Sequence, residues 1–193
     1  MENKKTHFYR LDLFLQRWRI RKAIPYIKQG AKVLDIGCWD GVLFRMLGEK
    51  LGYGVGIDPL ITPEKTANYA LYEGYFPQDL PEADAKGFDA ITMLAVLEHI
   101  PAEILEGFVK ACYDSLHIGG VIIITVPDTK VDYIISLLQF LRLSTATSFE
   151  EHYGYDIRQT RPILEKAGFQ LVKHKKFQLG LNNLFVFRKG ESR

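Results

Sequence analysis

Short apolar runs alternate with stretches of helical periodicity along most of the chain. Residues 31–37, AKVLDIG, are mostly apolar and end in a turn, which is typical of a strand buried on both faces of a parallel sheet. Residues 41–52 carry apolar side chains at helical spacing and stop near a glycine, so we expect a helix there. Residues 53–59, YGVGIDP, predict a second strand. The pattern of strand, helix and strand then starts again.

The alternation continues through the middle of the chain. Residues 67–74 have a helical register, and residues 75–80, YFPQDL, indicate a weaker third strand. We expect the fourth strand within residues 88–100 and the fifth within residues 120–128. The helix between them, within residues 101–120, opens at a proline and closes at a pair of glycines.

The C-terminal part adds one more helix and two strands. Residues 157–169 predict the helix, and residues 170–179 and 182–189 predict strands close enough to pair antiparallel. Repeated alternation of this kind builds an open sheet covered by helices on both faces. The sequence therefore predicts a Rossmann-like, doubly wound α/β fold, with a mostly parallel seven-stranded sheet and an antiparallel C-terminal strand.

Length and composition favour a single domain over residues 1–193. Of the 193 residues 47% are hydrophobic, which suits one sizeable core and would be cramped for two. The two cysteines, Cys38 and Cys112, have no disulfide or metal-site spacing, so we expect a cytoplasmic protein without a bound metal. The first residues lack the apolar core of a signal peptide, and no apolar run approaches the ~18 residues of a membrane span.

Charge is distributed unevenly along the chain. The net charge is only +2, yet residues 1–32 hold nine basic and two acidic side chains. Apolar residues recur there at helical spacing, so residues 1–30 are expected to form a basic amphipathic helical segment. Three interpretations stay open: a packed helix with a solvated basic face, a lid over a ligand, or a peripheral contact with an anionic surface such as a membrane.

The turn after the first predicted strand, residues 33–41, VLDIGCWDG, is the first candidate for chemistry. Ligands of open α/β sheets bind at the carboxyl ends of the strands, where helix N-termini offer free N–H groups. A nicotinamide dinucleotide fingerprint would need glycine where Trp39 and Val42 stand. A nicotinamide-dependent enzyme is therefore disfavoured, although it stays an alternative.

Two glycines and two acids favour a ribose-bearing ligand without a pyrophosphate. Gly37 and Gly41 let the backbone approach a ligand closely. Asp58 ends the second predicted strand, where a carboxylate can accept hydrogen bonds from both ribose hydroxyls. Asp35 stands just before the turn. Each acid could instead cap a helix N-terminus, but two acids at successive strand ends, joined to the glycines, favour the ligand.

These motifs resemble those of the class I S-adenosylmethionine-dependent methyltransferases. VLDIGCWDG is similar to their first motif, GVGIDP to the second, FDAITMLAVLEHI to the fourth strand and LHIGGVIIITVPD to the fifth, in the family's order and spacing. The resemblance covers about residues 31–189 and implies S-adenosylmethionine as the cofactor. Quinone-precursor methyltransferases and the methionine-biosynthesis-associated type look most similar.

The resemblance implies a cofactor site built from four successive strand ends. The turn after the first strand would hold the methionine end of the cofactor, and the acid that ends the second strand would bind its ribose. The residues near position 80 would contact the edge of the adenine, and the end of the fourth strand would lie under the cofactor. In chain order these residues are Asp35, Gly37, Cys38, Gly41, Asp58, Pro59, Asp79, Leu80, Leu94 and Ala95.

Trp39 departs from the family pattern, because it stands where the motif has its middle glycine. We expect a negative φ at this residue, with the indole turned away from the cofactor. Trp39 would then form a wall of the acceptor pocket, together with Tyr153. It could also sit over the sulfonium, or simply pack onto the N-terminal helix.

Methyl transfer asks little of side chains, because alignment of the acceptor and the methyl group at ~3–3.5 Å supplies much of the rate. A general base is needed when the acceptor must lose a proton. His99 and His152 are the candidates, since imidazole titrates near neutral pH. Glu98 and His99 could also merely end a strand. The signature of amino-group methylation on nucleic acid bases is missing after the fourth strand, so base methylation by that mechanism is disfavoured, and the sequence carries no strong nucleic-acid signal.

Residues 129–151 are the predicted cap and acceptor segment. Within them, residues 131–143 are apolar on nearly every side of a helix, which fits a buried cap, an acceptor pocket, a homodimer face or a membrane contact. We therefore expect an S-adenosylmethionine-dependent methyltransferase that acts on a small, apolar or lipid-like acceptor. A non-catalytic S-adenosylmethionine-binding partner or regulatory protein is the alternative.

Overall fold

The computed structural model describes residues 2–128 and 155–190, with side chains from residue 13 onward. The sheet has eight strands in the order β3-β4-β2-β1-β5-β6-β8-β7. The strand bounds are β1 Ala31–Ile36, β2 Leu51–Asp58, β3 Glu64–Lys65, β4 Tyr69–Glu73, β5 Phe88–Leu94, β6 Leu116–Pro127, β7 Phe169–Phe177 and β8 Asn182–Lys189.

Strand directions confirm the predicted mostly parallel sheet. β1 pairs in parallel with both β2 and β5, β2 with β4, and β5 with β6. The C-terminal strand β8 lies antiparallel between β6 and β7, as predicted. The two-residue β3 adds a short antiparallel edge beyond the seven strands expected.

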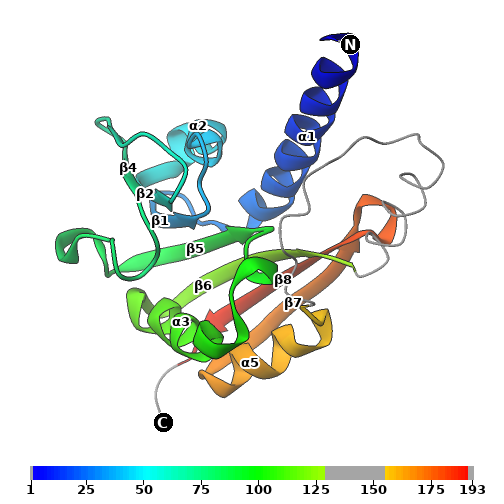
Figure 1. Cartoon of the computed structure of the whole chain (residues 1–193). Coiled ribbons are helices and arrows are strands. Elements are labelled where there is room, and N and C mark those ends of the chain that lie inside the picture. The colour runs from blue at the N-terminus through cyan, green and yellow to red at the C-terminus, as the bar shows by residue number, and fades with distance from the viewer. Residues whose placement is uncertain (1, 129–154, 191–193) are drawn as a thin grey trace.

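Helices cover both faces of the sheet (Figure 1). α1 (Glu2–Ala23) and α2 (Val42–Leu47) pack on one face, while α3 (Ala102–Ser115) and α5 (Thr160–Lys166) pack on the other. Alternate residues of each buried strand supply the two cores: in β6, Ile123 faces the α1 and α2 side. No helix in the described part of the chain is both long and apolar enough to cross a membrane.

Residues 67–74 were predicted as a helix, and this prediction is wrong. They contain β4, which pairs in parallel with the end of β2. Its side chains alternate: Leu71 packs with the core of the α1 and α2 face, and Tyr72 packs with the opposite core. Ala70, Leu71 and Tyr72 are too few to separate a two-residue period from a helical one by sequence alone.

Residues 75–80 were predicted as a strand and form a turn instead. The Asp79 N–H donates to the Tyr75 carbonyl at 2.9 Å, and an Asp79 carboxylate oxygen accepts the Tyr75 N–H at 2.8 Å. These two bonds close the chain on itself around Pro77. The third parallel position of the sheet is therefore held by β4.

The helix predicted to close at the glycine pair ends earlier. α3 stops at Ser115, and β6 begins at Leu116 and runs through both glycines. Lys189 of β8 donates to the carbonyls of Tyr113 and Leu116 at 2.7 and 2.8 Å. This lysine satisfies acceptors at the helix C-terminus and takes the place of a glycine cap.

Candidate functional site

The carboxyl ends of β1, β2 and β5 lie side by side and bring the predicted residues together. Asp35 of β1 stands opposite Gly56 of β2 and Thr92 of β5 in the strand registers. Because all three strands point the same way, the chain leaves each of them at one edge of the sheet, which we call the carboxyl edge.

The turn after β1 is built from alternate left-handed residues. Gly37, Trp39 and Gly41 have φ angles of +75°, +46° and +71°. The Gly37 N–H donates to the Ile57 carbonyl at 2.9 Å, which joins the turn to β2. A Cβ atom at Gly37 would also lie 2.4 Å from the Val96 side chain, so this position admits only glycine.

The negative φ predicted for Trp39 is wrong. Its backbone is left-handed, a conformation that costs a non-glycine residue about 1–2 kcal/mol. The Trp39 N–H donates to an Asp58 carboxylate oxygen at 3.1 Å, and this bond helps to hold the backbone in place. The indole is 51% exposed, so it is available to a ligand or partner, and its acceptor role stays a prediction.

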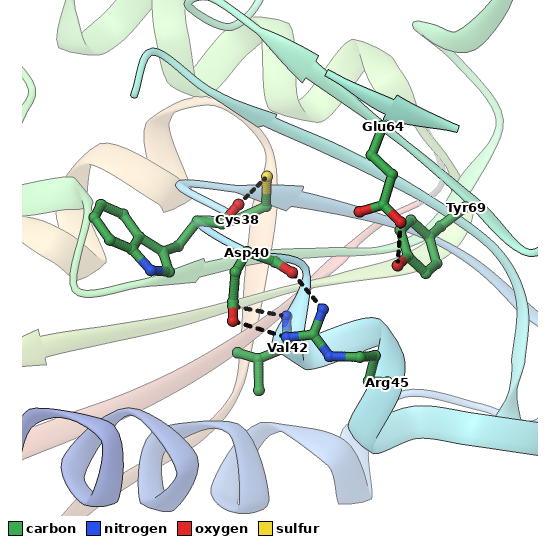
Figure 2. A network of polar contacts seen from close by, with 7 residues as sticks. Cys38, Asp40, Val42, Arg45, Glu64 and Tyr69 are labelled. Atoms are coloured by element: carbon green, nitrogen blue, oxygen red, sulfur yellow. Dashed lines mark hydrogen bonds and ion pairs between the residues drawn. The ribbon is translucent and has the colours of Figure 1, made fainter. Parts of the chain in front are cut away.

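Asp40 fastens the turn to the start of α2 (Figure 2). Its carboxylate accepts the Val42 N–H at 3.2 Å and pairs with Arg45 at 2.8 Å. Cys38 lies on the other side of the turn with its thiol buried, and that thiol would collide with any side chain at Gly56. The cofactor contact predicted for Cys38 could therefore come only from its backbone.

Asp58 ends β2 and has only 7% of its surface exposed. One carboxylate oxygen accepts the Trp39 N–H, and the other accepts the Leu60 N–H at 2.9 Å. A carboxylate oxygen can accept two hydrogen bonds, so each oxygen keeps one position for a ligand hydroxyl. Pro59 follows directly and begins the turn toward β3.

Asp35 is 5% exposed and accepts a hydrogen bond from the Thr92 hydroxyl at 2.6 Å. Burial raises the pKa of Asp35 to about 7; the Thr92 hydrogen bond opposes this rise, and the nearby Asp58 charge adds to it. A buried carboxyl that titrates near neutral pH is a frequent feature of functional sites.

The residues predicted for the adenine edge have separate environments. Asp79 is exposed and closes its own turn, as described above. Leu80 is buried in the core on the α3 and α5 face, beside Phe76. Their adenine contact stays a prediction.

At the end of β5 the chain again adopts a left-handed conformation. Ala95 has a φ of +65°, and its N–H donates to the Thr125 carbonyl at 2.9 Å. Leu94, just before it, is half-buried. Strained non-glycine backbone such as that of Ala95 is frequent at ligand sites, and the place of both residues under the cofactor stays a prediction.

Glu98 has features of a functional residue, although its sequence position also fits the end of a strand or the start of a helix. It is 3% exposed, and its Oε2 atom has no hydrogen-bond partner in the described part of the protein. Burial raises the pKa of Glu98 to about 7, while its own backbone N–H and the Arg19 charge oppose the rise. A glutamate directly before a histidine, LEH, was the only sequence signal for it.

Of the two predicted bases, only His99 can be placed. It is half-buried in a short 3₁₀ helix (Leu97–His99), and its backbone N–H donates to the Val96 carbonyl at 2.9 Å. His152, Tyr153 and residues 129–151 lie outside the described residues. Within residues 2–128 and 155–190 no group of three or more histidine, cysteine or acidic side chains could hold a metal ion.

A surface hollow of about 800 Å³ lies at the opposite, amino edge of the sheet, far from these residues. It is lined by Lys28, Asp89, His117 and Arg188, among others. Asp89 already pairs with Lys28 at 2.8 Å and accepts the Lys32 N–H at 2.8 Å. The acid of the hollow is therefore already paired with a lysine, whereas Asp58 is held by backbone N–H groups alone.

The carboxyl edge fits a ligand that carries a ribose and a cationic group. Asp58 offers spare acceptor positions, Asp35 and Glu98 are buried acids, and the glycine turn brings backbone close to the space beside them. Comparison with known proteins agrees: residues 7–174 match the family model described as "Methyltransferase domain".

Two curated relatives and one solved structure illustrate the likeness. The mitochondrial ubiquinone biosynthesis O-methyltransferase of Rattus norvegicus is 31% identical over 123 residues, 56% of this chain and 34% of that protein. Sphingolipid C9-methyltransferase B of Emericella nidulans is 36% identical over 105 residues, 49% of this chain and 20% of that protein. The chain thus spans about a third or less of these relatives.

A SAM-dependent methyltransferase structure from Archaeoglobus fulgidus superposes with a TM-score of 0.64. It is 20% identical, and the match covers 92% of this chain and 94% of that one. This likeness bears out the Rossmann-like doubly wound fold.

Proposed function

The chain belongs to the methyltransferase domain family, among the class I S-adenosylmethionine-dependent enzymes, and we propose that it transfers a methyl group to a small, apolar or lipid-like acceptor. Its cofactor is S-adenosylmethionine. When bound, this cofactor supplies an electrophilic methyl group on its sulfonium sulfur. The residues of the carboxyl edge bind it, orient it and define the place of the acceptor.

The observation that carries the proposal is the arrangement of Asp58. Backbone N–H groups of Trp39 and Leu60 fix its carboxylate, which is buried yet keeps acceptor positions for two ribose hydroxyls. The same Trp39 N–H ties Asp58 to the left-handed turn, so the ribose site and the backbone near the methionine end form one rigid unit. Asp35, in its ionised form, would attract the cationic amino group of the methionine end.

The acceptor would lie beside the end of β5 and the exposed indole of Trp39. In-line transfer needs the acceptor atom close to the methyl carbon and aligned with the bond that breaks. If the acceptor is a hydroxyl, His99 or His152 would take its proton, and Glu98 joins them as a third candidate because its pKa is near 7.

An apolar acceptor is supported by two observations of different kinds. The sequence of residues 131–143 is apolar on nearly every side of a helix. The rat and fungal relatives are named for a ubiquinone pathway and for a sphingolipid. We propose that the acceptor of this chain belongs to the same class, a small molecule with a large apolar part.

Location and partners are part of the proposal as well. Both cysteines are buried and free, which is in keeping with a reducing cytoplasmic setting. A homodimer and a peripheral membrane contact through the basic N-terminal segment are part of the same proposal.

The test has two stages. First, titration calorimetry with S-adenosylmethionine measures binding at the carboxyl edge, with Asp58→Ala as the site variant and Asp89→Ala at the amino edge as its matched control. Second, transfer of a labelled methyl group is measured with quinol and long-chain lipid acceptors. Tight cofactor binding without transfer to any acceptor would favour the alternative of a non-catalytic S-adenosylmethionine-binding protein.

A further inference from the structure

One side of α1 combines positive charge with an exposed aromatic ring. Phe14, Arg17 and Arg21 are exposed, and their spacing places them on one stripe of the helix. The opposite side of the helix, at Ile20 and Ala23, is buried against the sheet. In the N-terminal direction α1 extends beyond the sheet (Figure 1).

The turn between β7 and β8 presents a leucine almost entirely to solvent. Leu179 is 97% exposed and has a φ of +58°, next to Gln178 with a φ of +50°. Gln178 is buried, donates to the Leu15 carbonyl of α1 at 3.3 Å and accepts from Asn182 at 3.2 Å. The turn is therefore fastened to α1 while it holds an apolar side chain outward in a strained conformation.

Two lysines of β7 add charge beside this turn. Lys173 and Lys175 stand opposite Val186 and Leu184 of β8, whose side chains belong to the core on the α1 face. Directly opposed residues share a face of the sheet, so both lysines lie on the α1 face. Lys176 points to the other face, where it pairs with Asp128 at 2.9 Å.

These six residues form what we call the docking patch: Phe14, Arg17, Arg21, Lys173, Lys175 and Leu179. Its four cations form no ion pair with any residue in the described ranges. Its two apolar side chains are exposed, and nothing within the described protein accounts for a leucine held in solvent on a strained turn.

We propose that the docking patch binds an anionic lipid surface. Unpaired lysines and arginines around protruding apolar side chains match such a surface, since the cations meet the head groups while phenylalanine and leucine enter the acyl boundary. A nucleic acid would gain from the cations but not from Leu179, which cannot stack on a base. The turn lies at the carboxyl edge, so docking turns the cofactor site toward the lipid.

This inference specifies the membrane contact proposed for the N-terminal segment, and it does not depend on methyl transfer. It is tested by sedimentation of the protein with vesicles of phosphatidylcholine alone, and of phosphatidylcholine with phosphatidylserine. Binding is expected only to the anionic vesicles and should weaken as salt is raised. Equal binding to both vesicle types, or to neither, would overturn the proposal.

Two matched pairs of variants locate the contact. Leu179→Asp and Ile118→Asp make the same charge change at exposed apolar residues on opposite edges of the sheet, with Ile118 65% exposed. The first should lower vesicle affinity about tenfold and the second about twofold or less. Lys175→Gln should lower it about fivefold, and Lys176→Gln, on the other face, should leave it nearly unchanged.

Cofactor titration of each variant verifies its fold independently of lipid. Should Leu179→Asp not fold, Leu179→Gly removes the apolar group and also relieves the left-handed strain, and it should still lose affinity. Equal vesicle affinities within both matched pairs would overturn the proposal. So would a single-stranded RNA that binds with dependence on Lys175 but not on Leu179, because the patch would then serve nucleic acid.

Discussion

The two edges of the sheet differ in which residues adopt a left-handed backbone conformation. At the amino edge, left-handed backbone falls on glycines, among them Gly30, Gly87 and Gly119. At the carboxyl edge it also falls on Trp39, Ala95, Gln178 and Leu179, and these are the only non-glycine residues with positive φ in the described ranges. Strain is thus concentrated at the edge that carries the candidate site.

The two edges also differ in the direction in which the pKa values of their buried acids are shifted. Asp89 at the amino edge is partly buried, which alone would raise its pKa, but hydrogen bonds from Lys28 and the Lys32 N–H bring the pKa below its usual value. Asp35 and Glu98 at the carboxyl edge have raised pKa values instead, because burial outweighs their partners. A lysine thus favours the charged form of the acid at the amino edge, whereas burial favours the neutral forms of the two acids at the carboxyl edge.

The largest effect is expected when the carboxyl edge loses its ribose acceptor. Asp58→Ala should lower S-adenosylmethionine affinity by about 1.5–3 kcal/mol, roughly ten- to a hundredfold, through lost charge-assisted hydrogen bonds. Calorimetry measures it directly. Asp89→Ala should leave the affinity unchanged, and a comparable loss in both variants would erase the distinction between the edges.

A pH dependence of binding is the next largest effect. If the ionised form of Asp35 attracts the cofactor, affinity should rise about tenfold from about pH 5.5 to about pH 7, as this carboxyl ionises with its pKa of about 7. Asp35→Asn should bind more weakly and with little pH dependence. Asp89→Asn is the matched control, because it makes the same change at the amino edge and should leave the profile in place.

At the amino edge a charge deletion should affect stability and not binding. Asp89→Asn should lower the free energy of unfolding by about 1 kcal/mol at pH 7, because Lys28 and the Lys32 N–H lose a charged partner. The folded-state pKa of Asp89 is lowered, so its stabilisation is present above the unfolded pKa of about 4 and disappears as pH falls below it. Urea unfolding at several pH values should show the two proteins converging in acid.

The smallest effect isolates the strain at Trp39. Trp39→Gly and Trp39→Ala both remove the indole, but only glycine adopts the left-handed backbone without cost. The glycine variant should be more stable than the alanine variant by about 0.5–1 kcal/mol in urea unfolding. Equal stabilities would mean that the turn relaxes. Both variants should bind S-adenosylmethionine nearly as the parent does and should bind the acceptor differently.

Much of this architecture is predictable from sequence because buried parallel strands have a strong signature. β1, β2, β5 and β6 are apolar runs that end at turns, and their parallel order places Asp35 and Asp58 at one edge. The short β4 was not predictable, since its five residues fit a helical period equally well and its pairing with β2 decides the outcome.

The features that sequence reasoning missed are burial and backbone conformation, which depend on the three-dimensional fold. Glu98 becomes unusual only through its burial in the folded chain, which no local sequence pattern indicates. The sequence predicts a negative φ at Trp39 because bulky residues avoid the left-handed conformation, yet the hydrogen bond from its N–H to Asp58 stabilises that conformation here. Cys38 was predicted to contact the cofactor because it lies within the motif, but its side chain is buried in the core.

The most direct test of the central claim, that the carboxyl edge binds S-adenosylmethionine, is calorimetric titration of the protein with S-adenosylmethionine, S-adenosylhomocysteine and NADH. We predict micromolar binding of the first two, a strong loss of both in Asp58→Ala, and no binding of NADH. Binding of NADH alone, or no binding of the two S-adenosyl compounds, would contradict the account.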